Sequence, residues 1–279
     1  MRRIQRQQID LAGLYQQCVA QKRNAEMRQR FQIAQPTVVE SAMVYAQLGQ
    51  TMDVYQFVQP ATADGGATCK DMMELYETTL ARKKGAGRWA YDAILGAAPL
   101  GICPFCGQNR VSTLDHYLPK ETRWSLAITP DNLVPACRDC NYSKGTACPE
   151  AENMQPFHPY FDPLGNNQWL FASVERNNGL WVRFYVDDRG EWHGRAHRHF
   201  NLFNLGALYA TNAANELVGI RHQLVRLYAE VGSEAVRSDL IDRAHSYREA
   251  HLNSWQTALY QALASDDEFC SGDFNLIEV

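Results

Sequence analysis

The sequence predicts an α+β protein that is mainly helical, with a zinc-bound module near its middle and a small antiparallel hairpin or sheet toward the C-terminus. Three observations support this fold class. Apolar residues recur at helical spacing at both ends, two Cys-x-x-Cys pairs have thirty residues between them, and an Asn-Asn-Gly turn separates two β-rich segments. Of the 279 residues, 46% are hydrophobic and 21% are charged. These fractions are typical of globular proteins and exclude disordered, collagen-like and low-complexity classes.

Helical patterns cover the regions before and after the module. Apolar residues at three- and four-residue spacing predict helices within residues 9–19, 38–46 and 72–94. From residue 205 onward, a stripe that includes Leu217 and Leu224 predicts long amphipathic helices. The stripe is compatible with a dimer seam and hence a homo-oligomer. Packing against the same chain is favoured, because ordinary amphipathic helices show the same pattern.

Turn-forming residues suggest where the chain divides. The loosest segment, residues 59–68, contains Pro60, Asp64, Gly65 and Gly66 and marks a candidate boundary. We therefore predict five regions, which are an N-terminal helical region (1–68), a helical lead-in (69–100), a metal-bound module (101–150), a β-rich region (151–200) and a C-terminal helical region (201–279).

The β-rich region predicts a hairpin. Residues 169–174 and 181–186 are rich in β-branched and aromatic side chains, and Asn177-Asn178-Gly179 lies between them. Gly190 is expected to turn the chain into a third strand that ends near Phe200. That segment carries a dense set of basic and imidazole side chains, namely His193, Arg195, His197, Arg198 and His199. A solvated edge strand is favoured over a phosphate-facing strand or a second metal site, because His-x-His alternation also occurs without a ligand.

Charge and hydropathy limit the function classes. The net charge of −4 and the pI of about 6.1 exclude a generally basic, histone-like binder but permit local basic surfaces. Such surfaces are predicted at residues 1–30, with seven Lys or Arg against two acids, and at Arg82-Lys83-Lys84 with Arg88. No stretch reaches 18 apolar residues, and the N-terminus lacks the apolar segment of a signal peptide. We expect a cytoplasmic protein without membrane contact, whose eight cysteines are reduced thiols or metal ligands.

The two cysteine pairs predict a structural zinc site. Cys103 and Cys106 form the first pair, and Cys137 and Cys140 form the second. Two-residue spacing lets both thiolates of a pair reach one ion, and two pairs supply the four sulfur ligands that zinc prefers. Many unrelated folds use such a site, so the four cysteines alone indicate only structural zinc.

The residues around the cysteine pairs are more specific. Asp115 and His116 stand side by side, Asn132 lies shortly before the second pair, and Cys140 is followed by Asn141 and a Lys144-Gly145 step. In these features, residues 100–146 resemble the HNH endonucleases, the ββα-metal nucleases, in their four-cysteine zinc form. Asn141 occupies the third signature position, where the family name implies His and many members have Asn.

The resemblance implies a metal-dependent endonuclease that hydrolyses phosphodiester bonds. In this interpretation Asp115 and Asn141 supply oxygen ligands to a catalytic Mg²⁺ or Mn²⁺, and His116 acts as the general base. Asn132 completes the predicted catalytic set by pinning the loop between the strands. The reaction requires an activated water, neutralisation of the transition-state charge and stabilisation of the leaving oxygen, which these residue types and a divalent cation provide.

DNA is the predicted substrate. Four basic residues near the module are expected to contact its phosphates: Arg110, Lys120, Arg138 and Lys144. Residues 101–150 hold five bases and five acids, so further positive charge must come from residues 1–30, 82–88 or 189–199. Two alternatives stay open, which are cleavage of RNA and a non-catalytic zinc module that binds nucleic acid. Chains with such a module inside a larger scaffold also resemble effectors of mobile elements or antiphage defence, some of which work with an ATPase partner.

Overall fold

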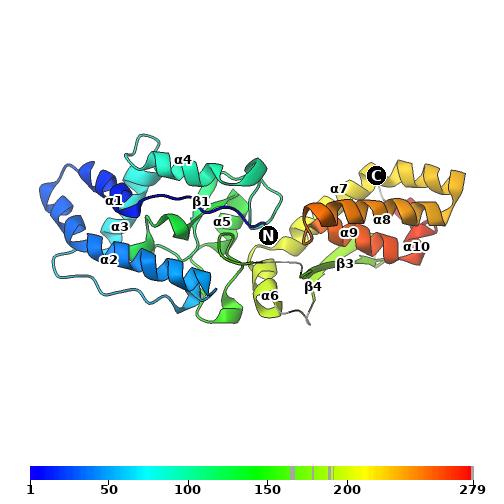
Figure 1. Cartoon of the computed structure of the whole chain (residues 1–279). Helices are drawn as coiled ribbons and strands as arrows, with labels where there is room; N and C mark the ends of the chain where they lie inside the picture. The colour runs from blue at the N-terminus through cyan, green and yellow to red at the C-terminus, as the bar shows by residue number, and fades with distance from the viewer. Residues whose placement is uncertain (164–166, 178, 188–189, 191, 278–279) are drawn as a thin grey trace. The chain divides into compact units, whose positions relative to one another are not determined.

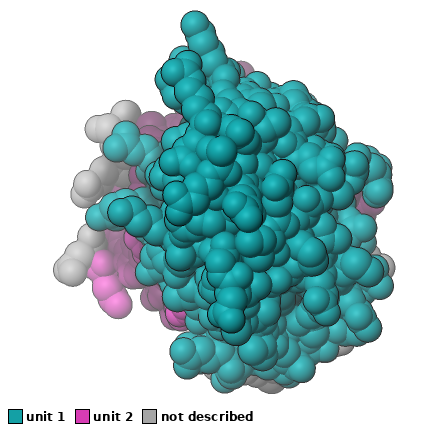
Figure 2. Space-filling view, turned by 90° about the vertical axis from the view of Figure 1, so that its left-hand side faces the viewer, with its two compact units in different colours: residues 1–163 teal, residues 164–279 magenta. Residues whose placement is uncertain are grey.

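The chain forms two compact units. The computed structural model describes residues 1–163, 167–177, 179–187, 190 and 192–277. Unit 1 spans Met1–Pro163 and unit 2 spans Leu164–Val279, and Figure 2 gives them separate colours. The division follows Pro163, inside the predicted β-rich region, and residues 59–68 lie within unit 1. Among the described residues, no helix is both long enough and apolar enough to cross a membrane.

Unit 1 begins with the helices that the apolar spacing predicts. They are α1 (Leu11–Ala20), α2 (Ala25–Gln50), α3 (Cys69–Leu75) and α4 (Arg88–Gly96), and a π-helical turn, η2 (Tyr76–Ala81), continues α3 (Figure 1). Side chains cap three of the helix starts. Asp10 accepts from two backbone N–H groups of α1, Asn24 accepts from one of α2, and Thr68 forms a capping box with Asp71 at α3. Such caps replace the backbone partners that a first helical turn lacks.

Short elements complete unit 1 around a ββα arrangement. Strand β1 (Thr113–His116) pairs antiparallel with β2 (Leu133–Ala136), so that Asp115 lies opposite Val134, and α5 (Arg138–Lys144) follows β2 directly. The single-turn 3₁₀ helices are η1 (Val54–Gln56), η3 (Pro99–Gly101), η4 (Trp124–Leu126), η5 (Pro130–Asn132) and η6 (Glu152–Met154). In Figure 1, β1 and α5 lie between α4 and α2. Helix α4 packs on both strands, and α2 packs on η4 and η5.

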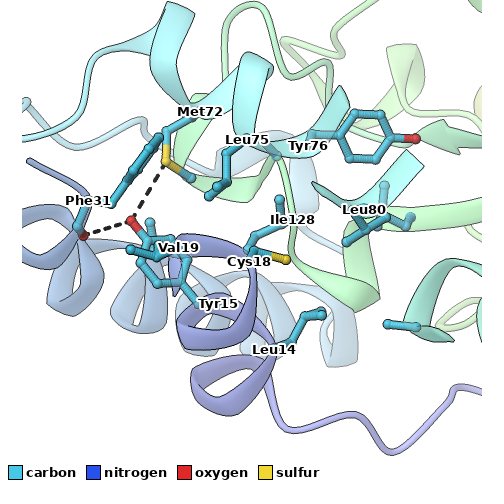
Figure 3. Close-up of a cluster of buried hydrophobic side chains, with 14 of the residues drawn as sticks. Leu14, Tyr15, Cys18, Val19, Phe31, Met72, Leu75, Tyr76, Leu80 and Ile128 are labelled. Carbon is cyan, nitrogen blue, oxygen red and sulfur yellow. Dashed lines mark hydrogen bonds between the residues drawn. The ribbon is translucent and has the colours of Figure 1, made fainter. Parts of the chain in front are cut away.

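One hydrophobic core joins the helices of unit 1 to the strands. Figure 3 shows its centre, where the hydroxyl of Tyr15 donates a 2.8 Å hydrogen bond to the carbonyl oxygen of Phe31 and lies 3.9 Å from the sulfur of Met72. Leu114 of β1 and Leu133 of β2 belong to the same buried cluster. The ββα arrangement therefore shares apolar packing with the surrounding helices, which supply apolar surface that a module of this size cannot bury alone.

Unit 2 combines one hairpin with a set of helices. Strands β3 (Leu170–Glu175) and β4 (Trp181–Val186) pair antiparallel, which confirms the predicted hairpin; Asn178 of the turn lies outside the described residues. The helices are α6 (His193–Leu202), α7 (Leu205–Val231), α8 (Ser233–Ala250), α9 (Trp255–Ser265) and α10 (Asp267–Cys270), followed by η7 (Asp273–Leu276). Together with unit 1, these elements confirm a mainly helical α+β fold.

The predicted third strand is wrong. His193–Leu202, which includes His197, Arg198 and His199, forms helix α6; Arg189 lies outside the described residues. The prediction followed the alternation of polar side chains. Burial instead falls on Ala196, His199 and Phe203, at the spacing of three and four residues that places side chains on one helical face.

The long apolar stripe of unit 2 packs within the same chain. Leu217, Ile220 and Leu224 of α7 and Leu240 of α8 are buried. Helix α7 packs on β4, α8 and η7. This burial agrees with the favoured interpretation of the stripe, and a homo-oligomer stays a prediction.

Truncating Leu133 tests the shared core. Leu133→Ala removes a fully buried side chain where β2 meets the helices, and we expect the free energy of unfolding to fall by about 2–5 kcal/mol. Urea unfolding of the full chain measures the change. Val58→Ala, at a side chain that is 81% exposed, serves as the control and should change the free energy by less than about 0.5 kcal/mol. Equal effects of the two substitutions would contradict the shared core.

Candidate functional site

The four paired cysteines come together at one point. All are buried, and their sulfur atoms lie within 4.8 Å of one another. The sulfurs of Cys106 and Cys137 are 3.9 Å apart, close to the spacing of about 3.8 Å that tetrahedral Zn–S bonds of about 2.3 Å impose. The predicted ligand set is therefore assembled as a zinc site requires.

Local backbone geometry explains how the two pairs meet. Gly107 follows the first pair with a φ of 67°, and its N–H donates a 2.8 Å hydrogen bond to the carbonyl oxygen of Cys103. A residue with a side chain rarely adopts this conformation, so glycine suits the turn. The second pair begins α5, where the backbone N–H of Cys140 donates to the sulfur of Cys137 at 3.4 Å. Such N–H groups stabilise thiolates, because they place partial positive charge beside the sulfur.

His116 ends β1 as a buried, oriented imidazole. Its Nε2 lies 2.8 Å from the carbonyl oxygen of Ala127. The rings of Tyr76 and His116 form a T-shaped contact, with their centres 4.5 Å apart. A carbonyl oxygen only accepts hydrogen bonds, so we assign the proton to Nε2, which leaves the lone pair on Nδ1. Burial lowers the pKa of His116 to about 3, so the ring is neutral near pH 7.

Asp115 is held by a buried ion pair with Lys144. The Nζ of Lys144 lies 3.2 Å from each carboxylate oxygen and also donates a 2.5 Å hydrogen bond to the backbone carbonyl of His116. Burial raises the pKa of Asp115 to about 6, although Lys144 acts in the opposite direction. Only Oδ1 has hydrogen-bond geometry to Lys144, and the buried Oδ2 accepts no hydrogen bond from the described residues.

A cleft of about 560 Å³ brings three of the four predicted catalytic residues together. Asp115, His116 and Asn141 all line it. Asn141 lies in α5 directly after Cys140, and its backbone N–H donates to the carbonyl oxygen of Cys137 at 3.1 Å. The cysteine cluster therefore fixes the part of α5 that presents Asn141 to the cleft.

Asn132, the fourth predicted catalytic residue, is not among the residues that line the cleft. Its side chain is fully buried, with Oδ1 accepting from the N–H of Leu118 at 2.8 Å and Nδ2 donating to the carbonyl oxygen of Leu118 at 2.9 Å. The backbone carbonyl of Asn132 accepts from the N–H of Tyr117 at 2.8 Å. These bonds close the loop between β1 and β2, which also carries Ala127, the partner of His116.

The four basic residues predicted to contact phosphate occupy different positions. Lys120 lines the cleft and pairs with Glu121 at 2.7 Å, whereas Arg110 and Arg138 are exposed and are not among its lining residues. Lys144 is only 3% exposed, and its ammonium group is taken by Asp115 and His116. A positioning role therefore fits Lys144 better than the predicted phosphate contact.

Two features of the cleft had no clear signal in the sequence. Tyr76, which packs on His116, appears in the sequence only as one apolar position of a helix; in Figure 3 its ring extends away from Phe31 and Met72. The ion pair between Asp115 and Lys144 joins residues 29 positions apart, and the resemblance alone placed both of them near the cleft.

Known proteins share these features. Residues 103–147, which include the four cysteines and the cleft residues Asp115, His116 and Asn141, match the HNH endonuclease family. The chain is 30% identical to protein ea31 of Escherichia phage lambda over 264 residues. This alignment covers 85% of this chain and 88% of ea31. The chain is also 28% identical to the Septu protein PtuB of Bacillus thuringiensis over 85 residues. That alignment covers 30% of this chain and 32% of PtuB. No solved structure matches the chain.

The alignment with ea31 covers 85% of the chain and therefore includes residues of both compact units, whereas the HNH match lies within unit 1. The fold of that segment agrees, since two antiparallel strands, one helix and four clustered cysteines lie within it. The chain therefore belongs to the same family as ea31, and it carries an HNH endonuclease domain.

Proposed function

We propose that the chain is a metal-dependent endonuclease that hydrolyses phosphodiester bonds in DNA. One observation carries the proposal. Asp115, His116 and Asn141 line a single cleft beside four clustered thiols. An imidazole with a free lone pair, two oxygen donors and an adjoining structural metal site together meet the requirements of metal-assisted hydrolysis.

The cleft residues fit a hard divalent cation. Asp115 offers a buried carboxylate oxygen, Oδ2, to which no described residue donates a hydrogen bond, and Asn141 of α5 offers an amide oxygen. Mg²⁺ and Mn²⁺ prefer such oxygen ligands and retain several waters. When bound, the ion supplies charge neutralisation at the scissile phosphate and stabilises the leaving oxygen.

His116 would take the proton of the attacking water. The hydrogen bond from Nε2 to Ala127 fixes the ring orientation and leaves Nδ1 to accept a proton. Lys144 would act as a positioning residue, because one ammonium group binds both the Asp115 carboxylate and the backbone carbonyl of His116. Asn132 would keep the Ala127 loop at its position behind the ring.

The biological setting is proposed from the relatives. The similarity to ea31, a protein of a phage, supports a role in a mobile element or in defence against one. We place the protein in the cytoplasm, where free thiols persist. A partner such as an ATPase stays a prediction.

Replacing the imidazole tests the general base. His116→Ala should reduce DNA cleavage by about 10²–10⁴-fold, because no other group takes the proton. Cleavage of plasmid and of labelled linear DNA is measured with EDTA-treated protein, before and after Mg²⁺ or Mn²⁺ is restored. A parallel assay on labelled RNA tests the alternative substrate.

The control for this experiment is His245→Ala, which removes an exposed imidazole of unit 2 and should leave cleavage unchanged. Zinc content and circular dichroism should be the same in both variants. Undiminished cutting by His116→Ala would refute the role of the base. DNA binding by the wild type without any cutting would favour the non-catalytic zinc module.

Replacing one thiol tests the structural metal. Cys137→Ser should lower the zinc content from one ion per chain and abolish cooperative unfolding of unit 1. Structural zinc contributes about 10–16 kcal/mol in small zinc-finger peptides, as much as the whole stability of a typical domain. Elemental analysis and thermal unfolding measure the two effects. Cys148→Ser is the matched control, since Cys148 lies outside the cluster. Full zinc content in Cys137→Ser would contradict the assignment.

A double-mutant cycle tests the buried ion pair. Lys144→Met leaves the Asp115 carboxylate buried without its partner, so we expect the metal-free protein to lose about 3–5 kcal/mol of unfolding free energy. Asp115→Asn combined with Lys144→Met should recover most of that loss. Lys120→Met breaks the ion pair with the exposed Glu121 and should cost less than about 1 kcal/mol. Equal losses of unfolding free energy for the two lysine variants would show that the buried pair with Asp115 stabilises the fold no more than the exposed pair with Glu121.

A further inference from the structure

Three consecutive cations have no partner in the described part of the chain. Arg82, Lys83 and Lys84 are exposed, and their side chains form no ion pair or hydrogen bond there. The next basic residue, Arg88, differs, because it pairs with Asp92 at 2.8 Å and stacks on the ring of Tyr91. We call residues 82–88 the basic loop.

The basic loop joins two elements that form a wall of the cleft. Tyr76 and Ala81, the first and last residues of η2, line the cleft, and so does Tyr91 of α4. The loop begins directly after Ala81. The segment with the three cations therefore starts next to a residue that lines the cleft together with Asp115 and His116.

The structure fixes the path of this loop closely. The N–H of Gly87 donates to the carbonyl oxygen of Thr79 at 2.9 Å. A Cβ on Gly85 would lie 2.0 Å from that same oxygen, so only glycine fits. From α1, the side chain of Gln21 accepts from the N–H of Ala86 at 2.8 Å and donates to the carbonyl oxygen of Lys84 at 3.4 Å. These hydrogen bonds hold the backbone of the three cationic residues in one conformation. A backbone that is already ordered lowers the entropic cost of binding a ligand.

The π-helical turn belongs to the same arrangement. In η2 the hydroxyl of Thr79 donates to the carbonyl oxygen of Leu75 at 2.5 Å, which supplies a partner where the wider turn disturbs the usual ladder. Single π-turns within α-helices often occur at functional sites. Here the turn places Tyr76 on His116 at one end and the start of the basic loop at the other.

Charge accounting shows why the loop matters to the cleft. Lys144 pairs with Asp115, and Lys120 pairs with Glu121, so the two lysines nearest the predicted catalytic residues are already neutralised. Residues 101–150 have no net charge, with five bases and five acids. Among the described residues, the basic loop adds three exposed cations without an ion pair, and positive charge of this kind attracts a phosphate backbone.

We infer that the basic loop binds the phosphate backbone of the DNA that enters the cleft, through Arg82, Lys83 and Lys84. This inference rests on the proposed nuclease function. The proposed contact is electrostatic and independent of base sequence, because each of the three cations pairs with a phosphate oxygen whichever base that nucleotide carries. It holds the strand while the reaction proceeds at Asp115 and His116.

Removing the three charges tests the inference. Arg82→Gln, Lys83→Gln and Lys84→Gln are combined in the His116→Ala background, and binding to fluorescein-labelled double-stranded DNA is followed by fluorescence anisotropy between 50 and 200 mM salt. Each lost phosphate contact lowers the slope of log K against log salt by about 0.9, so we expect a slope that is smaller by about 2–3. Affinity at the lowest salt should fall at least about tenfold.

The matched control removes exposed charge elsewhere. Arg226→Gln with Arg248→Gln eliminates two exposed cations of unit 2 and should leave the slope unchanged. An unchanged slope in the triple variant would overturn the inference. An equal loss per charge in the control would also overturn it, because binding would then follow net charge alone.

The two hypotheses fail in different ways. Wild-type protein that binds DNA with the expected slope but never cuts it would refute the nuclease and leave the loop contact intact. Wild-type protein that cuts DNA, while the triple variant keeps the full slope, would refute the loop contact and leave the nuclease intact. Thermal unfolding of the triple variant should match that of His116→Ala, since the three side chains form no ion pair or hydrogen bond with the residues that the structure describes.

Discussion

The arrangement of the cleft depends on four sulfurs that meet beside it. Cys103 and Cys106 come from a turn before β1, and Cys137 and Cys140 come from the start of α5. Drawing these two segments together also brings α5 against β1, so that Asn141 faces Asp115 across one cleft. A zinc ion held by these thiolates would give this junction a strength that hydrophobic contacts of so few residues cannot reach.

The remaining order comes from the helices that surround the ββα arrangement. Leu114 and Leu133 complete a core whose other members lie mostly on α1, α2, α3 and α4. In the proposed function those helices also take part, because η2 supplies the ring that packs on His116 and the segment that follows η2 carries Arg82, Lys83 and Lys84. Residues of unit 1 outside the HNH segment therefore pack with its strands and line the same cleft.

Local signals predicted much of this structure, and non-local contacts account for what they missed. Residue spacing was sufficient for the hairpin at Asn177 and the long helices, because each depends on neighbours in sequence. The cysteine cluster joins pairs thirty residues apart, and it was predictable because the paired spacing indicates one shared metal ion. The third strand failed because alternating histidines hid the helical spacing of Ala196 and Phe203. The burial of Lys144 was not predictable, since a lysine pairs inward only when the fold brings a carboxylate to it.

The hydrogen bond between His116 and Ala127 has a consequence for how this family can vary. The acceptor is a main-chain carbonyl, so the tautomer of the imidazole depends on the course of the backbone and not on the identity of residue 127. Exchange of that alanine for another small amino acid that fits the enclosed space preserves the acceptor. Lengthening or shortening the connection between the strands displaces it. We therefore expect relatives to vary in the side chain at position 127 more readily than in the length of the connection between the strands.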